Sequence, residues 1–263
     1  MIFMPRSVFF DTQIPTQVND GSIPAKDWNA LLTRMSGVYE YRVSLNTFLE
    51  LLNALEGGDE SHFEHNRKRL LVLTDPGCKF LPLTPDFIRQ SVLGLPLERQ
   101  EFSPRMLQEQ WLPVLKASRN RDELVKSIPL QVIRSEIEGG KKLWAEVLQL
   151  ATDSSEKMPS KDTYAKFHLR YFAHADITTE NIKKVGDALD AAYCHLAYIH
   201  HEGTTSCYKF ATYAQDRIDN QQLVYLADSE CTFVTADQKL IAKLDQSTRR
   251  RQVRHFKEFC QNL

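Results

Sequence analysis

Two acidic residues stand where short apolar segments of the sequence end. Asp11 follows "SVFF" and Asp237 follows "CTFVTA". Short runs of β-branched and aromatic residues are typical of buried β-strands. The carboxyl ends of neighbouring strands in an open parallel sheet line one crevice, and ligands bind there. Asp11 and Asp237 are therefore expected to face the same crevice.

Two further acids are expected to reach that crevice from helices. Glu50 lies in "SLNTFLELL", after a second predicted strand, and Asp219 opens "DNQQLVYLA", which has a helical pattern. Four carboxylates brought together repel one another, and unpaired they would take up protons with raised pKa values. A divalent cation removes that conflict, and hard oxygen ligands suit Mg²⁺ or Mn²⁺. Such a site can position a water molecule for attack on a phosphodiester.

The elements that must position these acids alternate between strand and helix. Alternating or wholly apolar short runs predict strands, whereas apolar residues at helical spacing predict helices. The predicted strands are residues 7–10, 39–45, 78–83 and 231–235, and the predicted helices between them are 26–35, 46–56 and 60–72. The segment between the first strand and the first helix is interpreted as a loop. This alternation predicts an α/β fold with a central, mainly parallel sheet of about five strands flanked by helices.

The middle of the chain has a different pattern. From about residue 95 to 210, amphipathic helical runs follow one another without a convincing strand. We therefore expect a single domain over residues 1–263. Its sheet-forming parts lie at about 5–90 and 215–263, and the helical insertion at about 95–210 separates them.

Taken in order, the acidic motifs resemble those of the PIN-domain nucleases. In that family an Asp closes the first strand, a Glu-Leu lies in the helix after the second, an Asp opens a later helix, and an apolar strand ends in Thr-x-Asp. The chain has "VFFDT", "SLNTFLELL" and "DNQQLVYLADSECTFVTAD" in that order, and "FLPLTPDFI" is similar to the family's run after its third helix. The resemblance covers about 5–90 and 215–263 and does not explain the insertion.

The resemblance implies a PIN-like fold and a Mg²⁺- or Mn²⁺-dependent endoribonuclease. By this resemblance Asp11, Glu50, Asp219 and Asp237 would ligate the metal, and Thr235 would hold a water or a carboxylate. The family includes toxins of toxin–antitoxin pairs and ribosomal RNA processing nucleases. Single-stranded or structured RNA is thus the expected substrate, and an antitoxin or another protein inhibitor is a candidate partner. The alternative is a PIN-like module that binds RNA or protein without cutting. RNA versus DNA, the number of metal ions and the oligomeric state, a homodimer included, stay open.

Other residue groups offer additional or competing sites. The basic segment "STRRRQVRHFK" carries residues that could follow a phosphate backbone, namely Arg249, Arg250, Arg251 and Arg254, although such a charge run is usually a solvated face. The histidines of "HFEH" and "CHLAYIHHEG" could form a transition-metal site, but His195 and His200 are not spaced to share one helical face. Asp219 could also do no more than cap a helix.

Composition and charge exclude few classes of protein. The formal net charge of −1 favours neither a nucleic-acid-coating protein nor an acidic one. The five cysteines form no C-x-x-C pair, which fits reduced thiols. No segment approaches the roughly 18 apolar residues of a membrane span, and no export signal with a cleavage site is present. We therefore expect a cytoplasmic protein without membrane contact.

Overall fold

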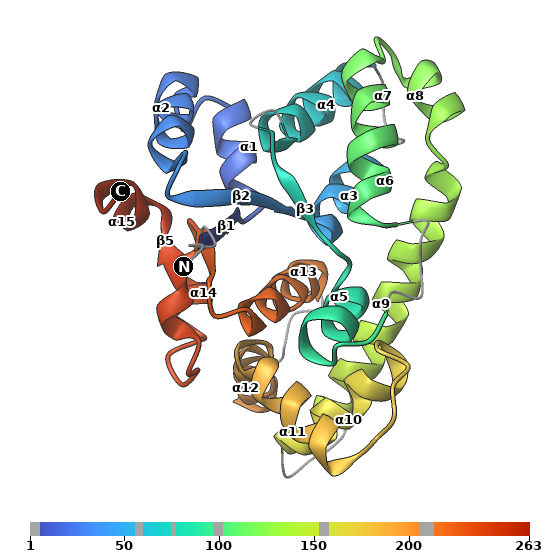
Figure 1. Cartoon of the computed structure of the whole chain (residues 1–263), viewed down its shortest axis with the longest axis vertical. Coiled ribbons are helices and arrows are strands. Elements are labelled where there is room, and N and C mark those ends of the chain that lie inside the picture. The colour runs from blue at the N-terminus through green and yellow to red at the C-terminus, as the bar shows by residue number, and fades with distance from the viewer. Residues whose placement is uncertain (1–5, 56–59, 75–76, 97–101, 153–157, 206–212) are drawn as a thin grey trace.

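A computed structural model describes residues 6–55, 60–74, 77–96, 102–152, 158–205 and 213–263 of the chain. At its centre lies a five-stranded sheet in which every strand is parallel to its neighbours, in the order β3-β2-β1-β4-β5. The strands are β1 (Arg6–Phe10), β2 (Tyr39–Ser44), β3 (Lys79–Leu81), β4 (Cys231–Thr235) and β5 (Val253–His255). The predicted α/β fold with a mainly parallel sheet is confirmed (Figure 1).

The chain starts the sheet at β1 and extends it first on one side of β1 and then on the other. From β1 the chain adds β2 and β3 on one side and later β4 and β5 on the other, so that β1 and β4 lie side by side, with Phe9 paired to Phe233. A crevice at the carboxyl ends of the strands is expected at such a switch point. Asp11 directly follows β1, and Asp237 lies two residues after the end of β4. Both acids therefore stand at the switch point.

Side chains of β1 alternate between two buried faces of the sheet. Val8 and Phe10 belong to one apolar cluster, whereas Phe9 belongs to the other, where its ring stacks on Phe233 at 4.8 Å between centroids. A parallel sheet covered by helices on both faces buries successive residues in this way.

Helices cover the face of Val8 and Phe10, and they come from the N-terminal part of the chain, the first half of the insertion and the C-terminus. They are α1 (Gln13–Asn19), α2 (Ala25–Met35), α3 (Leu45–Asn53), α4 (Glu60–Thr74), α6 (Pro104–Met106), the π-helical turn η2 (Leu107–Trp111), α7 (Leu112–Ala117), α8 (Arg121–Ser127) and α15 (Phe256–Gln261).

The face of Phe9 is covered by the segment that follows β3, the second half of the insertion and the elements around β4. These elements are α5 (Thr84–Phe87), the π-helical turn η1 (Ile88–Val92), α10 (Lys161–Tyr171), α11 (Thr179–Ala188), α12 (Asp190–Thr205), α13 (Tyr213–Leu223), the 3₁₀ turn η4 (Val224–Ala227) and α14 (Gln238–Ala242).

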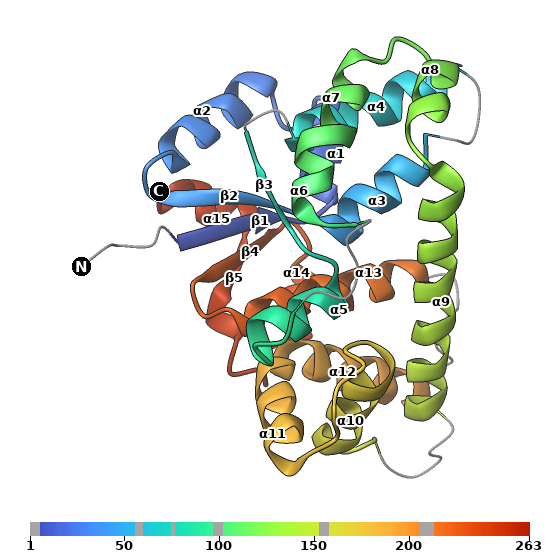
Figure 2. The same cartoon turned by 45° about the vertical axis from the view of Figure 1, so that its right-hand side comes forward.

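The long helix α9 (Leu130–Thr152) joins the two halves of the insertion. Its first part contributes Ile133 and Ile137 to one apolar cluster, and its second part contributes Trp144 and Val147 to the other. Figure 2 shows α9 running along the side of the molecule, from α8 above the sheet to α10 below it. The insertion therefore builds both cores instead of forming a separate body.

Strand β5 and helix α1 are among the elements that were not predicted from the sequence. Strand β5 lies inside the basic segment "STRRRQVRHFK", and helix α1 occupies the segment that was interpreted as a loop. A three-residue strand with the sequence Val-Arg-His has too little apolar pattern to be recognised, and β5 forms only beside β4. Helix α1 contains Pro15, Thr16 and Val18, which have low helix propensity, so tertiary packing must stabilise it.

Two expectations about the whole chain can be compared with the described residues. Among them, no helix is long and apolar enough to cross a membrane. The cysteines that the structure describes, Cys78, Cys194, Cys231 and Cys260, are free thiols. Cys207 and residue 56, the last residue of the helix predicted over 46–56, lie outside the described residues.

Candidate functional site

Asp11 is held at the end of β1 by hydrogen bonds to both of its oxygens. Oδ1 accepts from the backbone N–H of Gln13 at 3.3 Å and from the Thr12 hydroxyl at 3.1 Å, and Oδ2 accepts from the Thr235 hydroxyl at 2.7 Å. The side chain is completely buried. Burial raises the pKa of Asp11 above its ordinary value, the hydrogen bonds offset part of that rise, and the charge of Asp237 adds to it. The fold therefore fixes a carboxylate at a position that is unfavourable for a negative charge.

Thr235 connects Asp11 to Asp237. Its hydroxyl donates to Asp11 and accepts the backbone N–H of Asp237 at 3.0 Å. Asp237 is the N-cap of α14, because its Oδ1 accepts the backbone N–H groups of Lys239 at 2.7 Å and Leu240 at 3.1 Å. Both cap bonds go to Oδ1, so Oδ2 takes no part in the cap. One strand end and one helix start therefore bring these two acids together.

Asp219 lies inside helix α13, so the expectation that it opens a helix is wrong. Asp216 lies one turn earlier on the same helix, and His195 faces both acids from α12. One ligand atom from each of His195, Asp216 and Asp219 lies within 4.8 Å of the others, and all three residues are buried. Residues three apart lie on the same side of a helix, which explains how the two acids meet.

The imidazole of His195 is completely buried. Its Nε2 lies 3.5 Å from Asp216 Oδ1, which is too long for a good hydrogen bond, and neither ring nitrogen has a hydrogen-bond partner among the described residues. Burial lowers the pKa of His195, Asp216 offsets part of that effect, and Asp237 offsets a smaller part. The ring is therefore neutral at pH 7.

A lysine neutralises part of this cluster. Lys243 Nζ donates to Asp216 Oδ1 at 2.9 Å, and its side chain is 19% exposed. The charge of Asp237 acts on both Asp11 and His195, so Asp237 lies near Asp11 and also near the cluster on α12 and α13. The carboxyl edge of β1 and β4 therefore carries acids from the strand ends and, beside them, from α13.

Glu50 is paired with a cation. On α3, it forms an ion pair with Arg217 of α13, and the two side chains are 22% and 4% exposed. Arg217 also donates through Nη1 to Gln221 Oε1 at 3.1 Å. A buried bond from Gln222 Nε2 to Thr47 Oγ1 at 2.6 Å holds α3 against α13. Burial lowers the pKa of Arg217 to about 10, which keeps the guanidinium charged at pH 7.

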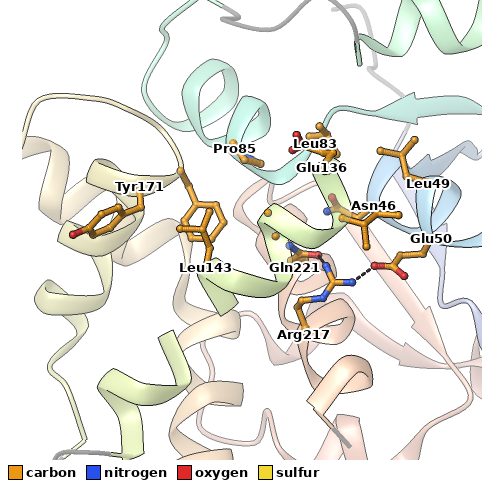
Figure 3. A pocket seen from close by; sticks show the side chains of 14 residues that line it. Asn46, Leu49, Glu50, Leu83, Pro85, Glu136, Leu143, Tyr171, Arg217 and Gln221 are labelled. Atoms are coloured by element: carbon orange, nitrogen blue, oxygen red, sulfur yellow. Dashed lines mark hydrogen bonds and ion pairs between the residues drawn. The ribbon is translucent and has the colours of Figure 1, made fainter. Parts of the chain in front are cut away.

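The ion pair lines a pocket of about 110 Å³ between α3, α9, α13 and the segment before α5. Figure 3 shows the guanidinium of Arg217 pointing at the carboxylate of Glu50, with Gln221 and Asn46 beside them and Tyr171 at the far side. The predicted ligand Glu50 is therefore neutralised by Arg217, a basic residue that was not predicted to lie at the site.

The basic segment faces another part of the molecule. Arg251 and Arg254 line a hollow of about 540 Å³ together with Arg6 and Tyr39, the first residues of β1 and β2. The starts of parallel strands lie at the edge opposite their ends, so these arginines gather away from Asp11. Arg254 Nη1 lies 3.4 Å from Glu258 Oε1.

The other two arginines of that segment lie in its turn. Arg250 Nη1 donates to the carbonyl of Val253 at 3.1 Å, and its Nε lies 3.4 Å from Asp245 Oδ1. Arg249 precedes this turn and is partly buried.

Three of the residues that shape the site were not selected from the sequence. Asp216, Arg217 and Lys243 are polar residues of ordinary helical segments, and His195 was considered only together with its neighbours on α12. The spacing of Asp216 and Asp219 was the one available signal, since it places two acids on one helical side. No protein-family model, no curated protein and no solved structure matches the chain. Function must therefore be argued from the geometry of the site.

Proposed function

We propose that this chain is a metal-dependent ribonuclease of the PIN-like type, which hydrolyses phosphodiester bonds of RNA at the carboxyl edge of β1 and β4. The observation that carries the proposal is the connection of Asp11 and Asp237 through Thr235 at the switch point of a parallel sheet. A strand order with this switch point has its ligand crevice at the same edge. The acidic motifs that resemble the PIN family support the same assignment.

The residues at this edge fit a divalent cation. Asp11 is a buried carboxylate whose pKa is raised by burial and by the neighbouring charge of Asp237, and a cation would relieve both effects. Asp11, Asp219 and Asp237 would hold Mg²⁺ or Mn²⁺ through oxygen atoms. A bound cation of this kind supplies Lewis-acid activation of water and stabilises charge on the reacting oxygens. Glu50, the fourth predicted ligand, would first have to leave Arg217.

The side chains around the acids have defined roles in this proposal. The hydroxyls of Thr12 and Thr235 and the N–H of Gln13 orient the carboxylate of Asp11, so that it enters the site in one geometry. The cap bonds at Oδ1 hold the carboxylate of Asp237 at the start of α14 and do not involve Oδ2. Such preorganisation avoids rearrangement during the reaction.

A second candidate function has its own supporting observation. Two of the acids are neutralised by cations, Glu50 by Arg217 and Asp216 by Lys243. Acids that are paired in this way suit a PIN-like module that binds RNA or a protein partner, such as an inhibitor, without cutting. The two candidates differ in whether the chain cleaves RNA when metal is added.

A cleavage assay separates the two candidates. The full chain and the variants Asp11→Asn and Asp237→Asn are incubated with a labelled RNA pool in Mg²⁺ or Mn²⁺. Glu230→Gln, an exposed acid at the opposite edge, is the control. We expect each site variant to lose activity by on the order of 10²- to 10³-fold, as when one group that stabilises transition-state charge is removed. The control should retain the wild-type rate.

Two results would overturn the nuclease proposal. One is cleavage that survives both Asn substitutions, since it would come from another site or from a contaminant. The other is wild-type protein that cuts no RNA with either metal. RNA binding without cleavage in the second case would favour the binding module.

A further inference from the structure

A second group of potential ligands lies beside the strand-end acids, where α12 faces α13. Its members are His195, Asp216 and Asp219, and they differ from the Asp11–Asp237 pair because they include a nitrogen ligand. Both ring nitrogens of His195 lack a hydrogen-bond partner among the described residues, although the ring is completely buried. Most buried polar side-chain atoms do have such a partner, so this ring needs an explanation.

The positions of His195, Asp216 and Asp219 provide an explanation for the unpartnered nitrogens of His195. A ligand atom from each lies within 4.8 Å of the other two, so one ion between them could contact all three after small side-chain movements. Imidazole nitrogen suits first-row transition metals, whereas Mg²⁺ is bound almost entirely by oxygen atoms. Two carboxylates with one imidazole therefore favour a transition metal over Mg²⁺.

We propose that His195, Asp216 and Asp219 form a binding centre for a divalent first-row transition metal, of the Mn²⁺ and Zn²⁺ class, in preference to Mg²⁺. This inference deepens the proposed function, since Asp219 belongs to both sites and the centre would select the metal that the nuclease uses. It predicts metal binding whether or not RNA is cut.

Lys243 compensates the charge of Asp216 in the absence of metal. Its ammonium group contacts Asp216 at 2.9 Å and also lies over the ring of Tyr198, 5.6 Å from the centroid. A bound cation would repel this ammonium group. Because the Lys243 side chain is 19% exposed, it can leave Asp216 for solvent while the three ligands stay buried. Lys243 thus competes with the metal for the carboxylate of Asp216.

The test measures metal binding to the full chain, stripped of metal, by calorimetric titration with Mn²⁺, Zn²⁺ and Mg²⁺. His195→Asn removes the nitrogen ligand, and His168→Asn is the matched control, because His168 is a buried histidine of α10 packed among aromatic rings. We expect His195→Asn to weaken Mn²⁺ and Zn²⁺ binding by at least about 100-fold, the upper end of the loss seen when a group that only supports a ligand is removed. Binding of Mg²⁺ should change little, and His168→Asn should bind all three ions as wild type does.

Equal Mn²⁺ affinity in His195→Asn and wild type would overturn the proposal, as would wild type that binds Mg²⁺ as tightly as Mn²⁺. If His195→Asn does not fold, pulsed electron paramagnetic resonance of Mn²⁺ bound to wild type gives the answer. Coupling of the ion to an imidazole nitrogen is expected, and its absence would reject the centre.

Lys243→Met provides an independent check, with Lys239→Met, an exposed lysine of α14, as its control. Lys243→Met should bind Mn²⁺ several-fold more tightly than wild type, and unchanged or weaker binding would contradict the proposed competition. Failure of the nuclease proposal gives a different pattern, in which metal binds with the expected preference but RNA stays intact.

Discussion

The ion pair between Glu50 and Arg217 connects the stability of the chain to the proposed metal site. Removing one partner of a buried ion pair leaves an uncompensated charge and costs about 3 to 5 kcal/mol. After Arg217→Met the remaining Glu50 side chain is 22% exposed and keeps contact with water, so we expect a cost near 3 kcal/mol. After Glu50→Met the remaining Arg217 side chain is only 4% exposed, so we expect a cost near 5 kcal/mol.

The double variant should be much more stable than the two single costs suggest. When both charges are replaced by apolar side chains of similar size, a buried pair is often lost without penalty. Urea denaturation in chelator at pH 7 gives the free energy of unfolding of wild type, both single variants and the double variant. The resulting cycle isolates the coupling between the two side chains.

The same variants test whether the carboxylate of Glu50 can bind metal. Arg217→Met removes a positive charge and frees the carboxylate of Glu50, so added Mn²⁺ or Mg²⁺ should stabilise this variant more than wild type. Each tenfold gain in affinity adds about 1.4 kcal/mol of unfolding free energy at saturating metal. Arg217→Lys keeps the charge and is the control for altered packing.

Two outcomes would refute this reasoning. If the double variant is destabilised by the sum of the single costs, Glu50 and Arg217 are not coupled. If metal stabilises Arg217→Met no more than wild type, the freed Glu50 carboxylate does not reach the metal, and Glu50 should be removed from the proposed ligands.

Three further predictions concern other parts of the molecule. In chelator, Asp237→Asn should melt at a higher temperature than wild type, because the amide keeps the cap of α14 but no longer repels Asp11. The same variant should lose stabilisation by Mn²⁺. Asp237→Ala loses the cap and should be about 1 kcal/mol less stable than Asp237→Asn, and equal stability of the two variants would contradict the cap. Burial lowers the pKa of His168 to about 3, so this neutral ring contributes stability above pH 6.5 that is lost as pH falls towards 3. Between pH 7 and 4.5 the loss should be about 2.5 kcal/mol in urea titrations, and His168→Phe should show a smaller loss. If the basic segment binds RNA, Arg251→Ala with Arg254→Ala should reduce the slope of log affinity against log salt by about 1.4 in filter-binding assays, whereas an unchanged slope would mean a solvated face.

The strand-end acids could be predicted because they depend on local pattern. The segments before Asp11 and Asp237 are apolar and short, and each ends where a polar residue follows, so their strands are visible in the sequence. The same holds for β2, for helix α3 and for the long helix α9. In each case the spacing of apolar residues within one segment reports which face will be buried.

The neighbours of Glu50 and Asp219 could not be predicted in this way. Arg217 meets Glu50 from 167 positions along the chain, and His195 meets Asp219 from another helix. Periodicity within a segment carries no information about which segments pack together. The orphaned nitrogens of His195 likewise result from the packing of α12 against α13.

Local sequence pattern thus specifies a parallel α/β sheet with Asp11 and Asp237 at the ends of two strands. The packing of distant segments adds the rest: the strand β5, the wrapping of the insertion around both faces, and the cations beside two of the acids. The physical reason is that strand and helix patterns reflect burial along one segment. The charge state and partners of a side chain depend instead on contacts between segments that come together when the chain folds.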